Sequence, residues 1–261
     1  MAALAVFCLR LAVGLLACLL LLHPDTGAAA PGPRSQRVGY RYYRTHFLTA
    51  LALSLAALLL VRQSAAGALL ALLGAGVALC FLGSLAWSLE GAPGGRALTV
   101  ITPATLAAGL GLLEAWSPRS EALAPVLLGD FASAAVLGAA LTAMLLGHSY
   151  LIAPAMSIRP LTRLLAALAV AVVLRAALDG YALWRWTDSH SLANLGNDTL
   201  LWLPVRWAVG FLAPLALGWM AWQTARIRST QSATGILYVV VIFCFLGELT
   251  ALLLRETGVV L

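Results

Sequence analysis

Five ionisable residues lie inside long apolar stretches of the sequence, where charged side chains are rare. They are Asp130, Arg175, Asp179, Arg206 and Glu248. A charged side chain at the centre of a membrane helix costs ~2.5 to 3.5 kcal/mol on insertion scales, so such residues usually face a partner, a water-filled cavity or a ligand. We therefore take these five residues as the candidate site of the protein.

The spacing of the five residues suggests that they form one polar chamber. Arg175 and Asp179 are four residues apart, which places them on one face of a helix, where they can form an ion pair. We expect Asp130 and Glu248 to pair with Arg206 across helices, which leaves a net charge of minus one. Such a chamber could pass protons, coordinate a small cation or hold a polar headgroup such as a quinone ring. The alternative is a set of interhelical ion pairs that bind nothing.

The composition indicates which elements hold these residues. Of 261 residues, 62% are hydrophobic and 10% are charged, and the mean hydropathy is +0.96. This excludes a soluble domain, in which about 25% of residues are charged. The apolar residues form eight blocks long enough to cross a ~30 Å hydrocarbon core. We predict an all-α, polytopic membrane bundle with 1–261 as a single transmembrane domain and spans near 3–22, 46–61, 65–89, 97–116, 123–146, 161–184, 200–223 and 235–254.

The distribution of arginine predicts how the bundle is oriented. The loops after the first, third, fifth and seventh spans hold nine arginines, and the loops after the second, fourth and sixth hold three. The positive-inside rule places the first set in the cytoplasm and both termini outside. At 1.5 Å per residue, the five candidate residues then all lie roughly 7 to 14 Å below the outer face. Glu114, nearer the end of its span, either joins them or reaches the headgroups.

Several kinds of site are excluded by residue types and their placement. The four cysteines lie in apolar segments without a CxxC pair, which argues against a disulfide framework, a zinc site or an iron–sulfur cluster. We therefore expect no metal site. The arginines cluster in particular loops, as expected where arginine marks the cytoplasmic side, and form no aromatic-interleaved basic surface for a nucleic-acid strand, so nucleic acid is not an expected partner. Arg10 interrupts the first apolar run, which is also longer than a signal-peptide core, so we predict a retained helix there.

Two histidines are candidate contacts for a cofactor. His46 and His148 fall at the predicted inner ends of the second and fifth spans, and they are the credible pair from separate helices for ligating a haem b or contacting a quinone. The alternative is that both imidazoles form hydrogen bonds in the headgroup zone. Close helix packing is a further expectation at small residues, namely Gly67, Gly74, Gly76, Gly109 and Gly111.

The motifs that are missing shape the functional prediction. The sequence has no Walker A loop, GxSxG, HExxH or dinucleotide fingerprint, so we assign no catalytic residue and expect no catalytic activity of its own. We predict a subunit of a larger electron-transfer or ion-translocating complex in a bacterial inner membrane, with membrane lipids and other subunits as partners. A stand-alone proton- or cation-coupled transporter or channel is the first alternative. An enzyme acting on lipid headgroups is the second.

Overall fold

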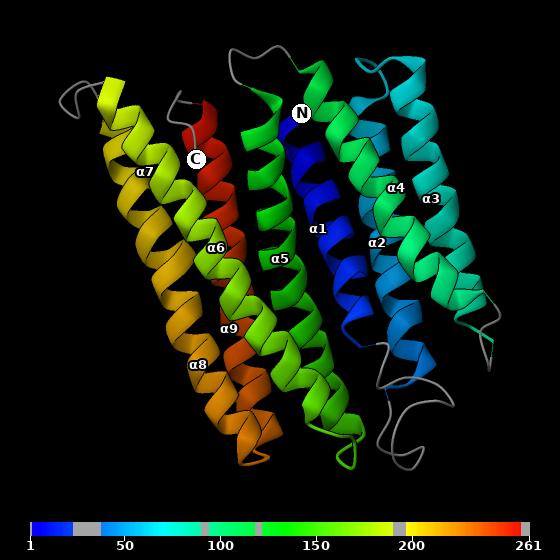
Figure 1. Ribbon diagram of the computed structural model, residues 1–261. Coiled ribbons are helices and arrows are strands. Elements are labelled where there is room, and N and C mark those ends of the chain that lie inside the picture. The colour runs from blue at the N-terminus through cyan, green and yellow to red at the C-terminus, as the bar shows by residue number, and fades with distance from the viewer. Residues whose placement is uncertain (1, 23–37, 90–93, 118–121, 190–196, 257–261) are drawn as a thin grey trace.

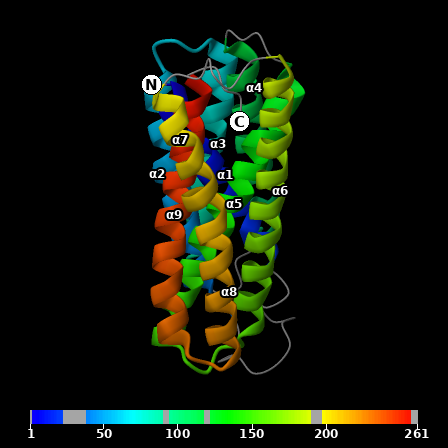
Figure 2. The same ribbon diagram turned by 90° about the vertical axis from the view of Figure 1, so that its left-hand side faces the viewer.

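The computed structural model describes residues 2–22, 38–89, 94–117, 122–189 and 197–256, and the main elements in these ranges are helices. Eight helical spans within them are long and apolar enough to cross a membrane. They lie side by side as one elongated bundle (Figures 1 and 2). The prediction of an eight-span helical membrane protein is confirmed to this extent. The spans are α1 (Ala2–Leu20), α2 (Tyr40–Val61), α3 (Gly67–Ala86), α4 (Gly95–Trp116), α5 (Leu123–Ile152), α6 (Arg159–Ser189), α7 to α8 (Asn197–Arg226) and α9 (Thr230–Glu256).

Some helices extend beyond the predicted spans. The second helix begins at Tyr40 rather than near His46, and the fifth continues to Ile152 rather than ending near Leu146. The third is shorter at both ends and covers Gly67–Ala86. Apolar length measures the part of a helix that fits a hydrocarbon core, whereas hydrogen bonding continues into polar turns at either end.

Two helices from distant parts of the chain form the centre of the bundle. The first helix, α1, packs against α2, α4 and α5, and α5 packs in turn against α6 and α9. In Figure 1, α2, α3 and α4 lie on one side of this central pair, and α6 to α9 lie on the other. Most of α1 is therefore buried by protein, although its sequence alone resembles any lipid-facing span.

The outer surface of the bundle is apolar. Large hydrophobic side chains are exposed along several helices, for example Leu59, Phe81, Val170 and Leu174. A monomer in water rarely exposes so much contiguous apolar surface, so these side chains contact membrane lipids. The protein is thus an integral membrane protein. The four cysteines are free and buried among the helices.

Helices α1 and α5 approach closely at two glycines that the sequence analysis did not single out. An added Cβ at Gly14 of α1 would lie 1.8 Å from the backbone oxygen of Ala134, and one at Gly138 would lie 2.1 Å from the carbonyl carbon of Gly14. Of the five glycines expected at close contacts, Gly76 and Gly109 fit the expectation, because an added Cβ at either would lie under 3 Å from a leucine side chain of the neighbouring helix. The prediction is wrong for Gly67 and Gly74, where an added Cβ would meet nothing within 4 Å, and at Gly111 it would make only an ordinary contact.

The seventh span is interrupted by a π-helical turn. It begins as α7 (Asn197–Trp207), passes through the π turn Ala208–Leu212 and continues as α8 (Ala213–Arg226). Pro214 follows this turn and has no backbone N–H, so the carbonyl four residues earlier, at Gly210, loses its usual partner. The backbone N–H of Ala213 accordingly donates to the oxygen of Ala208, five residues back. Such π turns frequently occur at functional sites, and this one begins two residues after Arg206.

Both described ends of the chain lie at the same end of the bundle. In Figure 1, α1 begins and α9 ends at the top. We call this end the terminal face and the other the opposite face. The placement agrees with the even number of spans, and whether the terminal face is the outer one stays a prediction.

Candidate functional site

The five residues predicted from the sequence belong to one buried network of charged side chains. Asp130 lies on α5, Arg175 and Asp179 on α6, Arg206 on α7 and Glu248 on α9, and each is at most 2% exposed. Three further charged residues, Arg10 on α1, Glu114 on α4 and Arg255 on α9, complete it. From the helix ends at 1.5 Å per residue, Arg10, Arg206 and Glu248 lie ~12 to 14 Å from the terminal face.

One half of the network joins α6, α7 and α9 and is centred on Arg206. Its Nε donates to Oδ2 of Asp179 at 2.8 Å, and its Nη1 donates to Oε1 of Glu248 at 3.1 Å. Arg175 pairs with Asp179 one helical turn away, as their four-residue spacing predicts. The Arg206 guanidinium also lies 4.3 Å from the centre of the Phe211 ring, which supplies a cation–π contact. The bidentate reach of arginine thus joins helices α6, α7 and α9.

The other half of the network extends to α1 and α4. Arg10 Nε donates to Oδ1 of Asp130 at 3.0 Å, and Arg10 Nη1 lies 3.9 Å from Oε2 of Glu248. Arg255 Nη2 donates to Oε2 of Glu114 at 3.0 Å, and its Nη1 lies 3.9 Å from Oδ1 of Asp130. A continuous chain of ion pairs therefore runs from Glu114 across the bundle to Asp179.

One predicted pairing is wrong. Asp130 does not pair with Arg206 but with Arg10, because α5 packs against α1. Arg10 could have been found from the sequence as well, because it is a charged residue inside an otherwise apolar helix. Arg255 gave a weaker signal, because an arginine at the end of a span is ordinary. Glu114 joins the network rather than reaching the headgroups, and its side chain is fully buried.

The full network is electrically balanced. Its four arginines face four carboxylates, so the net charge of minus one that the five-residue set predicts becomes zero once Arg10, Glu114 and Arg255 are counted. Removing charges from water is expensive, and pairing with hydrogen bonds offsets the cost. Among the described residues, every buried arginine, aspartate or glutamate belongs to this network. The described core toward the opposite face holds no comparable set of charges.

Small residues position the charged groups. Gly210 in the π turn and Gly247 on α9 face each other, and an added Cβ at Gly247 would lie 2.4 Å from Cα of Gly210 and 3.3 Å from Nη1 of Arg206. The two backbones approach closely enough for Arg206 to reach Glu248, the residue after Gly247. Gly129 plays a similar part on α5, where an added Cβ would lie 3.5 Å from Nη1 of Arg175.

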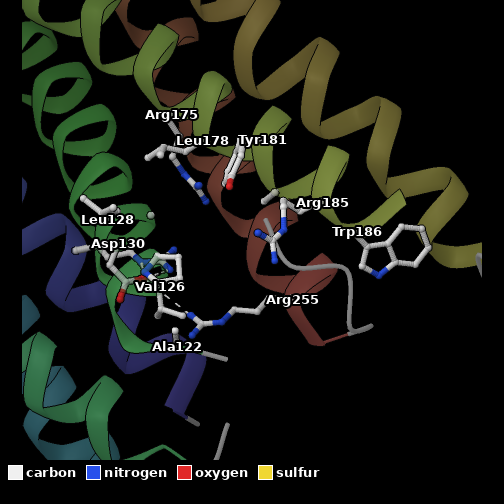
Figure 3. Close-up of a pocket in the computed structure, with 14 residues that line it drawn as sticks. Ala122, Val126, Leu128, Asp130, Arg175, Leu178, Tyr181, Arg185, Trp186 and Arg255 are labelled. Carbon is white, nitrogen blue, oxygen red and sulfur yellow. Dashed lines mark hydrogen bonds and ion pairs between the residues drawn. The ribbon is translucent and has the colours of Figure 1, made fainter. Parts of the chain in front are cut away.

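A pocket of about 720 Å³ adjoins the network between α5 and α6. Three network residues, Arg10, Asp130 and Arg175, form part of its wall. Figure 3 shows the polar ends of Arg175, Tyr181 and Arg185 facing one open space, with Asp130 and Arg255 bordering its other side. The remaining wall is mostly apolar and consists of Ala122, Pro125, Val126, Leu128, Gly129, Leu178, Ala182 and Trp186.

The pocket opens sideways toward the lipid. Leu128 on α5 is 59% exposed and Tyr181 on α6 is 57% exposed, and both line the pocket. On α6, the lining residues Arg175, Leu178, Ala182 and Arg185 follow the three- and four-residue spacing of one helical face. Ten residues at 1.5 Å each separate the first of these from the last, so the polar part of the pocket spans ~15 Å along α6.

Several buried polar atoms at the pocket make no hydrogen bond. They are Nη1 of Arg10, Oδ2 of Asp130 and Nε of Arg175, and Oε2 of Glu248 behind them is in the same state. Unsatisfied buried groups usually mark a place for water or a ligand. Four arginines and one carboxylate line the pocket, so its wall offers hydrogen-bond donors and positive charge rather than the oxygen ligands that a cation needs.

The two candidate cofactor histidines lie in different surroundings. His46 on α2 is fully buried, its Nδ1 is 2.9 Å from the backbone oxygen of Tyr42, and its Nε2 has no hydrogen-bond partner. His148 on α5 is exposed. This geometry gives no support to a haem held between them, and haem ligation stays a prediction.

No metal cluster stands out in the described part of the chain, where no three His, Cys, Asp or Glu side chains are grouped to hold an ion. Comparison with known proteins adds no assignment. The chain matches no protein-family model, no curated protein and no solved structure. The functional argument therefore rests on the network and the pocket.

Proposed function

We propose that this chain is a membrane subunit that binds the polar headgroup of a lipid-soluble ligand, such as a quinone ring, in the pocket between α5 and α6. The observation that supports this proposal is that the pocket borders the buried charged network. Arg10, Asp130 and Arg175 belong to both. Binding sites for small molecules combine a mostly apolar wall with a few polar groups that orient the ligand, and this pocket has both.

The donors in the pocket suit an oxygen-rich headgroup. Arginine N–H groups donate to carbonyl oxygens, and Nη1 of Arg10 and Nε of Arg175 are two buried donors that make no hydrogen bond. An apolar tail would leave past Leu128 and Tyr181, where the pocket opens toward lipid. The volume of about 720 Å³ is within the range of small-molecule sites.

The wider role that we propose is that of a subunit in an electron-transfer or ion-translocating complex of a bacterial inner membrane. Two features support it. The chain carries no motif for nucleotide-driven or hydrolytic chemistry. Among the described residues, the buried charged side chains also form a layer near the terminal face, where a headgroup site would lie.

A short-chain quinone tests the proposal. Quinones quench tryptophan fluorescence, and Trp186 lines the pocket. We expect saturable quenching of the full chain in detergent, reduced at least about tenfold in affinity by Ala182→Phe, which fills the pocket. Ala169→Phe makes the same change at an exposed site on the same helix, away from the pocket, and should leave quenching intact. Equal quenching in both variants and in the parent chain would contradict the proposal.

The second candidate is a proton-coupled transporter, favoured by one observation. Oδ2 of Asp130 and Oε2 of Glu248 are buried acceptors without hydrogen bonds, and each could receive a proton. Under this candidate, Glu248→Gln abolishes proton flux into liposomes while the bundle still assembles. Unchanged flux in that variant would leave the carboxylate as a structural partner of Arg206.

A further inference from the structure

Arg185 is the charged residue of the pocket that the network does not use. It lies on α6, close to the terminal face, and its side chain is exposed at the pocket. No carboxylate among the described residues pairs with it, whereas Arg10, Arg175 and Arg255 in the same wall each have one. Figure 3 shows the Arg185 guanidinium among the polar groups that border the pocket, near Tyr181.

The charges around the pocket favour an anionic ligand. The four arginines and four carboxylates of the network cancel, so Arg185 leaves one positive charge without a described partner at the pocket. A positive charge beside an apolar, partly enclosed surface is satisfied best by an anion that brings its own oxygen acceptors. A neutral ligand would bring no opposite charge to Arg185.

The shape of the pocket indicates that the anion carries an apolar tail. Arg185 and Arg175 mark the two ends of the polar part along α6, ~15 Å apart at 1.5 Å per residue. Between them lie Leu178 and Ala182, and the exposed Leu128 borders the lateral opening. A small soluble anion would fill only a fraction of this space.

We infer that the pocket binds one amphiphile with a singly charged phosphate or carboxylate headgroup, held by Arg185 with Arg255 beside it, and with its tail lying toward the lipid. This inference rests on the proposed function, because both use the same pocket. It narrows the ligand class from polar headgroups in general to anionic ones. The headgroup could be that of a membrane phospholipid or of a separate amphiphilic anion.

Native mass spectrometry of the full chain in detergent tests the inference. Phosphatidylglycerol carries one negative charge, and phosphatidylcholine, with no net charge, is the matched probe. We expect one phosphatidylglycerol per chain, bound about tenfold more tightly than phosphatidylcholine, since a hydrogen bond to a charged group contributes about that factor. Arg185→Gln should remove the preference, and Arg185→Lys should retain part of it. Arg226→Gln changes an exposed arginine at the opposite face and should alter nothing.

Competition experiments then distinguish which kind of anion the pocket recognises. Displacement of phosphatidylglycerol by millimolar inorganic phosphate would show that the phosphate group is what Arg185 recognises. Displacement by decanoate and not by phosphate would point to a carboxylate amphiphile. Equal binding of the two lipids, or a preference that survives Arg185→Gln, would overturn the inference.

The two proposals fail in different ways. If Ala182→Phe removes quinone quenching while Arg185→Gln leaves the lipid preference unchanged, the headgroup site stands and its anionic character is wrong. If Ala182→Phe affects neither ligand, the pocket is not a binding site and both proposals fall.

Discussion

Arg206 Nε lies 2.8 Å from Oδ2 of Asp179, and neither side chain is exposed at all. The two residues are on different helices, α7 and α6, so their contact fixes the position of one helix against the other. Arg206 also binds Glu248 on α9, which makes it the residue that connects the three helices on this side of the bundle.

Removing Arg206 should therefore destabilise the protein strongly. Arg206→Met leaves Asp179 and Glu248 without their main partner, and loss of one member of a buried pair costs ~3 to 5 kcal/mol. Unfolding by denaturing detergent, followed by circular dichroism, measures the difference. Arg226→Gln serves as the control, because Arg226 is exposed and a change there should have an effect near zero.

The crossing of α1 and α5 should tolerate no side chain at Gly14. Gly14→Ala places a Cβ within 1.8 Å of a backbone oxygen, so the helices must separate, at a cost of ~1 to 3 kcal/mol or more. Gly74→Ala meets nothing within 4 Å and should be neutral or slightly stabilising, because alanine is a better helix former. Thermal unfolding of the two variants compares them directly. A Gly14→Ala variant as stable as the parent chain would contradict the close crossing.

A second pair of glycine substitutions, at Gly247 and Gly235, tests the close helix contact beside Arg206. In Gly247→Ala the added Cβ would lie 2.4 Å from Cα of Gly210, so α9 moves away and the Arg206–Glu248 contact weakens. We expect a lower midpoint of thermal unfolding and weaker quinone quenching. Gly235→Ala, on the same helix with nothing within 4 Å, should preserve both. Loss of stability without loss of quenching would show that the pocket does not depend on this crossing.

The hydroxyl of Tyr42 connects α2 to the central helix. It donates to the backbone oxygen of Thr142 at 2.6 Å in a buried position. Tyr42→Phe should lower the free energy of unfolding by ~0.5 to 1.5 kcal/mol, the usual net contribution of one hydrogen bond. Tyr238→Phe, at an exposed tyrosine of α9, should change it by less than the error of a denaturation curve.

Purification from the native membrane tests the wider role. In mild detergent, we expect the chain to copurify with other membrane subunits, identified by mass spectrometry. A reduced-minus-oxidised visible spectrum of the same sample tests the haem prediction, because a b-type band that His46→Phe removes would locate the haem in this chain. A lone, colourless protein of 27.3 kDa would contradict the subunit proposal and favour the transporter.

The sequence alone predicts the class of fold because lipid imposes a simple rule. Every backbone polar group in the hydrocarbon core must be satisfied within its own segment, so long apolar blocks become helices whatever their neighbours are. The same local rule marks Asp130 and Glu248 as unusual and predicts the Arg175–Asp179 pair from spacing.

Only the tertiary structure decides which helices meet. Eight apolar helices can be arranged in many ways with similar hydropathy, and the choice depends on shape, as at Gly14 and Gly138. That contact places Arg10 beside Asp130, a partnership that sequence separation of 120 residues conceals. The pocket is likewise invisible in the sequence, because a cavity is defined by side chains from separate helices that fail to fill the space between them.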